Sequence, residues 1–463
     1  GILVRMSRKY FGTDGIRGQA NTPPMTADMA LKVAMAAAIV LRESQMRDKT
    51  DRVVIGKDTR LSGYMIEQAM TAGFCAMGLD VILTGPIPTP GVAMLTRSLR
   101  ADLGVVISAS HNPFQDNGIK LFGANGYKLD DALELQIEEM MDQDMSAHYA
   151  APADLGKASR LDDATGRYAE FIKQSFPRRQ SLEGVKVVVD CAHGAAYKVA
   201  PQVLWELEAD VISIGITPNG RNINDGYGAT AIDNLQRAVL DNGADIGIAL
   251  DGDADRLIVV DELGRKIDGD QLMATMALFM KSRGRLAGDK VVATVMSNLG
   301  LERFLKTQGI ELARTSVGDR YVVEAMRKDD LALGGEQSGH LIIHDFATTG
   351  DGLLAALQIL AVLKQSGKPA SEALYHFEPV PQILQNVRFQ SGGISAAAIL
   401  DQAQVKEALD QANSTLAADG RVLVRPSGTE PVIRVMAEGD DQSRVEQIVG
   451  DLCSVIASAA KSA

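Results

Sequence analysis

The chain of 463 residues is poor in cysteine, in positive charge and in long apolar runs. Its three cysteines, Cys75, Cys191 and Cys453, lie far apart and form no CxxC pair, which argues against a disulfide framework or a cysteine zinc site. Acidic residues outnumber basic ones by 59 to 47, and the net charge of −12 argues against nucleic acid or an anionic membrane as the main partner. Because no run of about 18 apolar residues occurs, the sequence predicts no membrane span.

The remaining composition, with 46% hydrophobic and 23% charged residues, is typical of a soluble globular protein. We expect a reduced, cytoplasmic protein, since the opening "GILVRMSRKY" is too short and too basic for a signal peptide. Met6 is the expected native start. A chain of this length predicts roughly three or four domains.

One pattern of short apolar runs occurs three times. "ADLGVVISAS" at Ala101 and "ADIGIALDGD" at Ala244 share a register that aligns Ser110 with Asp253, and "LALGGEQSGH" is a weaker third copy. Two β-branched runs precede each copy, with helical stretches between them such as 62–78 and 197–207. Each copy then passes through a polar loop into a returning apolar run, "GIKLF", "RLIVV" or "HLIIH".

The repeat predicts an α/β fold of three similar mixed-sheet domains with βαβ crossovers, followed by a smaller C-terminal α+β domain around a central cleft. Composition places linkers at "DMSAHYAAPADLGKASRLDDATG", near "DELGRKIDGD" and around "KQSGKPASEALYHFEPVPQ". The expected domains are therefore 1–155, 156–260, 261–372 and 373–463.

The first loop, "SASHNP", presents Ser110 where a strand must end. His111 is a poor base for this serine, because adjacent side chains on an extended chain point to opposite faces. No GxSxG motif surrounds it either. A turn serine is the simpler interpretation of the segment alone.

The second loop, "DGDADR", places Asp251, Asp253 and Asp255 at alternate positions between two apolar runs. On an extended segment this spacing projects three carboxylates to one side, which favours Mg²⁺ or another hard cation. A solvated acidic turn is the alternative. An aspartyl phosphatase would also use carboxylates and Mg²⁺, but with an Asp nucleophile.

The third and fourth loops suit a phosphorylated sugar. "GEQSGH" offers Glu336, Ser338 and His340 at alternate positions, which suits hydrogen bonding to sugar hydroxyls, although a polar hairpin explains it equally well. "RPSGTEP" combines arginine, hydroxyls and a Gly turn into an anion nest that best matches phosphate, with a capping turn as the alternative. Its candidate residues are Arg425, Ser427, Gly428, Thr429 and Arg434.

These four loops, in this order and across almost the full chain, resemble the signature loops of the α-D-phosphohexomutase superfamily. The opening "YFGTDGIRG", Ala254 in the second loop and Gln337 in the third resemble its bacterial amino-sugar branch. Ser108 departs from relatives that often have Thr, and it brings a second hydroxyl near Ser110.

The resemblance implies that Ser110 carries a phosphoryl group and that one Mg²⁺ per chain is bound by Ser110, Asp251, Asp253 and Asp255. It also implies that the fourth domain holds the phosphate that is not transferred. A phosphoserine needs no adjacent base as a donor, because positioning and charge neutralisation carry most of the catalysis. The substrate-binding residues are expected to be Arg256, Arg320, Glu336, Ser338 and His340.

The roles in proton transfer stay open. Arg17, Lys120 and His340 are family-matched positions, and we favour Lys120 and His340 as the acid and base. Lys120 could equally be only a counter-charge to the phosphoserine. For Arg320, a surface loop is the equal alternative to substrate contact.

The implied reaction interconverts glucosamine 6-phosphate and glucosamine 1-phosphate in UDP-N-acetylglucosamine biosynthesis, through a 1,6-bisphosphate that also serves as activator. The expected state is a monomer or homodimer. Residue chemistry alone does not distinguish glucosamine from glucose or mannose, because no loop holds a dedicated carboxylate for the 2-amino group. The alternatives are a phosphomannomutase or phosphoglucomutase of the same superfamily, and a sugar-phosphate or divalent-cation binding protein without turnover.

Overall fold

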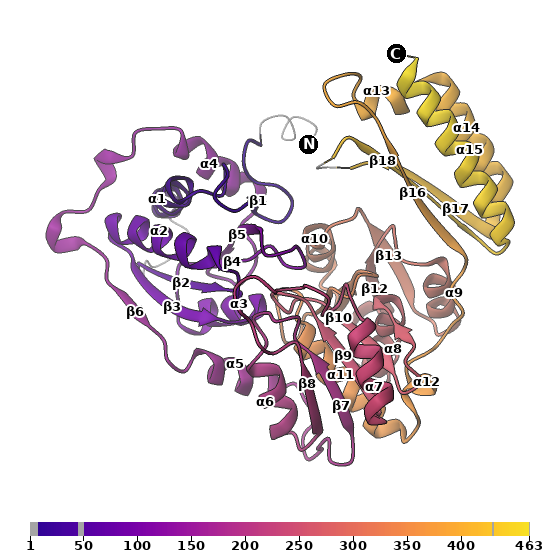
Figure 1. Cartoon of the computed structure of the whole chain (residues 1–463), viewed down its shortest axis with the longest axis horizontal. Coiled ribbons are helices and arrows are strands. Elements are labelled where there is room, and N and C mark those ends of the chain that lie inside the picture. The colour runs from indigo at the N-terminus through magenta and orange to yellow at the C-terminus, as the bar shows by residue number, and fades with distance from the viewer. Residues whose placement is uncertain (1–7, 45–50, 428–429, 463) are drawn as a thin grey trace. The chain divides into compact units, whose positions relative to one another are not determined.

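The computed structural model describes residues 8–44, 51–427 and 430–462 (Figure 1). Met6, Gly428 and Thr429 lie outside the described residues. The chain forms two compact units, one of Gly1–Thr294 and Ala313–His376 and the other of Val295–Leu312 and Phe377–Ala463. Within the described ranges, no helix is both long enough and apolar enough to cross a membrane.

The first sheet has the strand order β1-β5-β4-β2-β3-β6. Its central strands β2, β3 and β4 run parallel, and β5 returns antiparallel to β4 with Ile107 opposite Ile119. The strands are β1 (Ile16–Gln19), β2 (Arg52–Lys57), β3 (Asp80–Pro86), β4 (Leu103–Ile107), β5 (Asp116–Gly123) and β6 (Ala158–Arg160).

Helices cover both faces of this sheet, which explains why its central strands are almost entirely apolar. α1 (Ala27–Glu43), α2 (Ser62–Ala76) and α4 (Asp131–Met141) share one core with the sheet residues of their face. α3 (Thr89–Ser98) packs against β2 and β4. A glycine allows this close approach, since a Cβ at Gly104 would lie 2.3 Å from Thr96 Oγ1.

The second and third sheets repeat the central order of the first. β5-β4-β2-β3 corresponds to β10-β9-β7-β8 and to β15-β14-β12-β13. The predicted threefold arrangement of strand, loop and returning strand is therefore confirmed. The strands are β7 (Lys186–Asp190), β8 (Asp210–Ile214), β9 (Ile246–Leu250), β10 (Leu257–Asp261), β11 (Lys266–Ile267), β12 (Lys290–Thr294), β13 (Glu311–Thr315), β14 (Leu333–Gly335) and β15 (Leu341–Ile343).

Both helices that the sequence predicts are present, since 62–78 corresponds to α2 beside the first sheet and 197–207 corresponds to α6. α10 ends at a left-handed residue, Asp330, and α11 begins at the side-chain cap Asp351. The helices are α5 (Ala164–Lys173), α6 (Val199–Glu206), α7 (Asp233–Asn242), α8 (Gly269–Ser282), α9 (Leu299–Thr307), α10 (Asp319–Asp329), α11 (Gly352–Ser366) and α12 (Ala370–Ala373).

The C-terminal region has a different architecture, as predicted. Its described strands form one antiparallel sheet in the order β16-β18-β17, from β16 (Gln382–Arg388), β17 (Gly420–Pro426) and β18 (Val432–Gly439). Alternate residues of β18, Ile433 and Val435 among them, share a core with three helices. These are α13 (Ala396–Leu400), α14 (Ala403–Leu416) and α15 (Gln442–Lys461).

The first predicted linker contains one short strand that the sequence analysis did not predict. Within it, β6 adds a parallel edge strand to the first sheet, with Ala158 opposite Val81. All three β6 residues are exposed, so the strand pairs through its backbone and lacks the apolar alternation that would identify it in the sequence.

Candidate active site

Ser110 lies directly beyond β4 and its side chain is almost completely buried. Its backbone has a φ of 51°, a left-handed conformation that costs a residue other than glycine about 1–3 kcal/mol. The hydroxyl Oγ accepts hydrogen bonds from Lys120 Nζ at 2.8 Å and Arg17 Nη2 at 3.1 Å, and donates to Asp253 Oδ2 at 3.3 Å. Ser110 therefore joins two cations to the second loop, which a plain turn serine would not do.

Arg60 holds the serine loop in this conformation. Its side chain is fully buried, and Nε donates to Asp58 Oδ2 at 3.0 Å. The remaining guanidinium nitrogens donate to backbone carbonyls of the loop, at Ser110, Asn112, Pro113 and Asp116. One rigid, planar side chain thus fixes the path of the whole loop.

Ser108, the second hydroxyl of the loop, supports the backbone. Its Oγ donates to Asp58 Oδ2 at 2.6 Å and accepts from the Ser110 backbone N–H at 3.0 Å. Its side chain is fully buried. Because both bonds are internal, Ser108 is not positioned as a second nucleophile.

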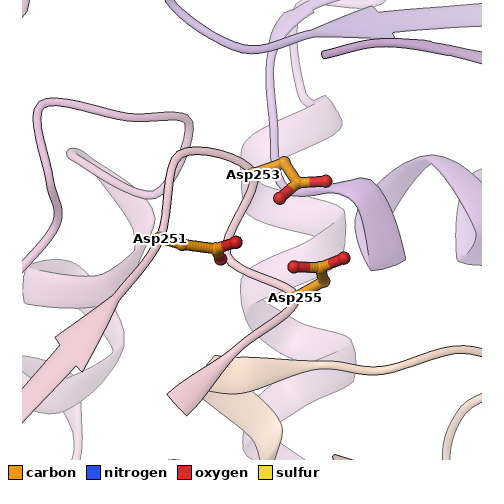
Figure 2. A group of neighbouring side chains, drawn as sticks. All are labelled: Asp251, Asp253 and Asp255. Atoms are coloured by element: carbon orange, nitrogen blue, oxygen red, sulfur yellow. The ribbon is translucent and has the colours of Figure 1, made fainter. Parts of the chain in front are cut away.

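Asp251, Asp253 and Asp255 lie in the loop between β9 and β10, with their carboxylates turned toward one another (Figure 2). All three are buried, and one potential ligand oxygen from each lies within 4.8 Å of the others. Ala254, with a φ of 57°, turns the loop between them. The three carboxylates lie together as predicted, but the loop is a turn and not the extended segment from which the prediction was made.

One oxygen of each carboxylate, Asp251 Oδ2, Asp253 Oδ1 and Asp255 Oδ1, is buried and has no hydrogen-bond partner in the described chain. Burial, together with Asp255 and Asp253, raises the pKa of Asp251 far above its usual value. Three buried carboxylates with open oxygens fit a hard divalent cation such as Mg²⁺, which would supply the missing positive charge.

Basic side chains lie beside Asp253 and Ser110 at one edge of the aspartate cluster. Lys120, on β5, is buried and its Nζ lies 3.0 Å from Asp253 Oδ2 and 3.5 Å from Asp14 Oδ2. Although burial opposes the charge, these carboxylates raise the pKa of Lys120, so it stays an ammonium. Arg17 donates to Asp14 Oδ2 at 2.6 Å as well as to Ser110. Two permanent cations therefore flank the serine hydroxyl.

The third loop lies beside the metal loop. Arg256 and His340 form an isolated antiparallel bridge, and His340 Nδ1 lies 3.6 Å from Asp255 Oδ2. The buried His340 ring packs over a glycine, since a Cβ on Gly350 would lie 2.4 Å from it. Burial raises the pKa of Glu336, with His340 and Arg256 acting in the opposite direction. Ser338 is exposed.

Arg320 corrects one expectation. It is buried in the first turn of α10, so the surface-loop alternative is wrong. Its guanidinium donates to Asp131 Oδ1 and Glu134 Oε1, each at 2.9 Å, and to the Leu129 carbonyl at 3.0 Å. These contacts tie the third domain to α4, and substrate contact by Arg320 stays a prediction.

The fourth loop belongs to the second compact unit, which contains Phe377–Ala463. Arg425 on β17 lies directly opposite Arg434 on β18. Burial and the neighbouring Arg434 lower the pKa of Arg425. Like charges opposite each other in a sheet repel, so an anion between them would be stabilised. Ser427 follows β17, and its backbone N–H donates to the Val432 carbonyl at 2.8 Å.

Several residues of the site were missed by the sequence analysis. Thr89, at the start of α3, donates to Asp253 Oδ2 at 2.6 Å, and Asn224 Nδ2 donates to the Ser110 carbonyl at 2.8 Å. Lys128 Nζ bridges Asp14 Oδ1 at 2.6 Å and Asp319 Oδ2 at 2.5 Å. Asp14 lies in "YFGTDGIRG", a segment that carries the family resemblance, but the sequence analysis assigned it no role. No local pattern marks Thr89 or Asn224.

Four family models match the chain in sequence order. They describe phosphoglucomutase/phosphomannomutase α/β/α domain I at residues 8–148, domain II at 166–264, domain III at 268–380 and the C-terminal domain at 384–455. The chain belongs to the phosphoglucomutase/phosphomannomutase family, within the α-D-phosphohexomutase superfamily.

Curated relatives point to one branch of that family. The phosphoglucosamine mutase of Rhizobium rhizogenes is 59% identical over 453 residues, covering 98% of this chain and 99% of the relative. The phosphoglucosamine mutase of Sinorhizobium medicae is 60% identical over 451 residues, covering 97% and 98%. Both similarities extend over nearly the whole of each chain.

Solved structures show the same fold. A phosphoglucomutase/phosphomannomutase family protein from Burkholderia thailandensis has a TM-score of 0.78 at 23% identity, covering 96% of this chain and 97% of that one. The N-acetylphosphoglucosamine mutase of Aspergillus fumigatus, solved with GlcNAc-6P and magnesium, has a TM-score of 0.67 at 17% identity, covering 99% and 97%.

Proposed function

We propose that the protein interconverts glucosamine 6-phosphate and glucosamine 1-phosphate, the reaction of a phosphoglucosamine mutase, in the cytoplasm. The observation that carries this proposal is the Ser110 hydroxyl 3.3 Å from Asp253, at the edge of three buried carboxylates with open oxygens. A nucleophile beside a cation site is what phosphoryl transfer requires. The choice of an amino sugar as substrate is based on the names of the curated relatives.

Ser110 is the phosphoryl carrier in this proposal. The bond between phosphorus and Ser110 Oγ breaks, a bond from phosphorus to a sugar hydroxyl oxygen forms, and the hydroxyl proton leaves to a base. The resulting 1,6-bisphosphate turns round and returns its other phosphoryl group to Ser110. Asp251, Asp253, Asp255 and phosphoserine would hold Mg²⁺, which when bound neutralises the charge of the transferring group.

Lys120 and Arg17 stabilise the phosphorylated serine. Both donate to Ser110 Oγ, so their charges face the position where a phosphoryl group attaches. Lys120 is enclosed by carboxylates, which suits a counter-charge better than a proton acceptor. His340 is then the better candidate for the proton, because its buried Nε2 has no hydrogen-bond partner in the described chain.

The remaining loops bind the substrate. Glu336 and Ser338 would accept or donate hydrogen bonds to sugar hydroxyls, with Arg256 between the second and third loops as a phosphate or hydroxyl partner. The cross-strand pair of Arg425 and Arg434, with Ser427, Gly428 and Thr429, would hold the phosphate that is not transferred. A sugar 1,6-bisphosphate would activate the enzyme by phosphorylating Ser110.

The loops also support four functional domains. We place the phosphoserine domain at 1–155, the metal-binding domain at 156–260, the sugar-recognition domain at 261–372 and the phosphate-binding domain at 373–463. At these boundaries β6 pairs with the sheet of the first domain, and β10 and β11 extend the second sheet to Ile267.

A direct comparison of substrates tests the proposal. Glucosamine, glucose and mannose 6-phosphates are assayed side by side with Mg²⁺ and a catalytic amount of sugar 1,6-bisphosphate, and formation of the 1-phosphate is measured. We expect the highest kcat/KM for glucosamine 6-phosphate and an added phosphate mass on Ser110. A preference for glucose or mannose would overturn the substrate, and an unlabelled, inactive protein would favour a binding protein without turnover.

A further inference from the structure

A hexosamine phosphate differs from a hexose phosphate by its 2-amino group, which carries positive charge near neutral pH, as an α-amino group does. Recognition of that group requires an anionic partner at the sugar loop. Apart from the metal ligands, the four loops offer Glu336 in the sugar loop and Glu430 in the phosphate loop. The structure brings one more carboxylate to the third loop, that of Asp319.

Asp319 is the first residue of α10, directly after Gly318. Its Oδ2 lies 3.6 Å from His340 Nε2, and its side chain retains 15% exposure. The Gly318 backbone N–H donates to Glu336 Oε1 at 3.3 Å, which fixes the start of α10 against the third loop. Asp319 and Glu336 therefore both border His340 in the structure.

The charges around Asp319 leave room for another cation. Lys128 is its cationic partner at 2.5 Å, but the same ammonium also bonds to Asp14 at 2.6 Å. Asp14 is also contacted by Arg17 and Lys120, whereas Lys128 is the one permanent cation against Asp319 among the described residues. Although burial opposes ionisation, Lys128 lowers the pKa of Asp319, so the carboxylate is charged at neutral pH. Independently, buried His340 Nε2 has no hydrogen-bond partner in the described chain.

We infer that Asp319 recognises the 2-ammonium group of the substrate and so sets the preference for amino sugars. This inference rests on the proposed function. An ammonium beside Asp319 would give this carboxylate a second cationic partner besides Lys128, whereas the neutral 2-hydroxyl of glucose 6-phosphate does not. Discrimination therefore depends on the charge of residue 319, while Glu336 binds hydroxyls common to both sugars.

The test compares kcat/KM for glucosamine 6-phosphate with that for glucose 6-phosphate in Asp319→Asn, which keeps the side-chain shape. We expect the ratio of the two to fall roughly 10- to 100-fold, the range for losing a charge-assisted hydrogen bond. Activity toward glucose 6-phosphate serves as the internal control for folding. Asp319→Ser, a second neutral replacement, should lower the ratio in the same direction.

Two further variants separate recognition from structure. Lys128→Met breaks the same ion pair from its other side and should lower both activities by similar factors. Asp329→Asn neutralises an exposed acid at the far end of α10 and should leave the ratio unchanged. Equal losses for both sugars in Asp319→Asn would overturn the inference. Wild-type protein without activity on glucosamine 6-phosphate would overturn the proposed function instead.

Discussion

The serine loop and the metal loop are built in opposite ways. In the serine loop, Arg60 donates to the carbonyls of Ser110, Asn112, Pro113 and Asp116, and Ser108 supports the backbone. In the metal loop, three buried carboxylates each keep an oxygen that has no hydrogen-bond partner among the described residues. The backbone of the first loop is held by internal bonds, whereas the second loop is electrostatically incomplete until a cation binds.

This difference indicates that the serine loop contributes mainly to the stability of the fold, whereas the metal loop contributes mainly to cation binding. The serine loop uses many internal bonds to hold Ser110 in a left-handed conformation, which places its hydroxyl in advance. The metal loop instead places like charges together, which costs free energy in the unliganded protein. Variants in the two loops should therefore affect different measurements.

Removal of the nucleophile gives the largest expected effect. Ser110→Ala should lower kcat by roughly 10³-fold or more, because it removes the hydroxyl that Lys120 and Arg17 both contact, while Ser108 is held by internal bonds. Its thermal unfolding should change little. Ser108→Ala is the matched control, which should keep measurable turnover while losing about 1–3 kcal/mol of stability, because Asp58 Oδ2 loses one hydrogen bond and the buried Ser110 N–H loses its acceptor. Substantial turnover by Ser110→Ala would contradict the covalent role.

Arg60→Met tests whether the serine loop depends on one buried guanidinium. The substitution leaves the Asp58 carboxylate buried without its cation and several carbonyls without a donor, so we expect about 3–5 kcal/mol of destabilisation. Urea denaturation measures the change in the free energy of unfolding. Arg178→Met, at an exposed arginine, should change it by less than about 0.5 kcal/mol. Similar values for both variants would refute this account.

Asp253→Asn tests the metal loop. Loss of one charge should weaken Mg²⁺ binding on the order of 10- to 100-fold, and activity should partly return at high Mg²⁺. The increase in thermal stability on adding Mg²⁺ should need correspondingly more metal than in the wild type. Asp241→Asn, at an exposed residue of α7, is the control. An unchanged Mg²⁺ titration would show that the cation binds elsewhere.

The smallest effect concerns the helix behind the metal loop. Gly352 N–H donates to the Ala254 carbonyl at 2.9 Å, and the preceding Asp351 accepts from Tyr168 Oη at 2.9 Å. Burial raises the pKa of Asp351 to about 7, from about 3.9 in an unfolded chain. Between these values the folded state binds more protons, so this group lowers stability as the pH rises from about 4 to about 7.

Asp351→Asn removes that titration but keeps a capping side chain. The stability of the wild type relative to this variant should therefore fall by about 1–2 kcal/mol between pH 5 and pH 7, measured by urea denaturation at each pH. Asp130→Asn, an exposed cap of α4, should show no such trend. A rising relative stability would mean that Asp351 is ionised in the fold.

The sequence was most informative where one local rule decided the structure. Alternation of apolar runs with loops predicted the three related sheets, and alternate aspartates on one loop predicted their shared side. Arg60 was missed because the serine-loop carbonyls that it contacts lie around 50 residues away and no spacing rule marks them. Arg320 was singled out in the sequence, but its carboxylate partners were not predicted, because they come from α4 almost 190 residues earlier. Long-range burial of charge has no local pattern.

Each of the three sheets contains a strand, a polar loop and a returning antiparallel strand, here called the strand corner. Its loop varies independently of the strands that support it. In each sheet the paired strands beneath the corner are apolar and buried, as in Val105 opposite Leu121 and Ile248 opposite Val259. The short polar loop above them differs each time, from a serine to three aspartates to a glutamate and histidine. A duplicated gene segment can therefore gain new chemistry without rebuilding its core, and an engineer can exchange the loop in the same way.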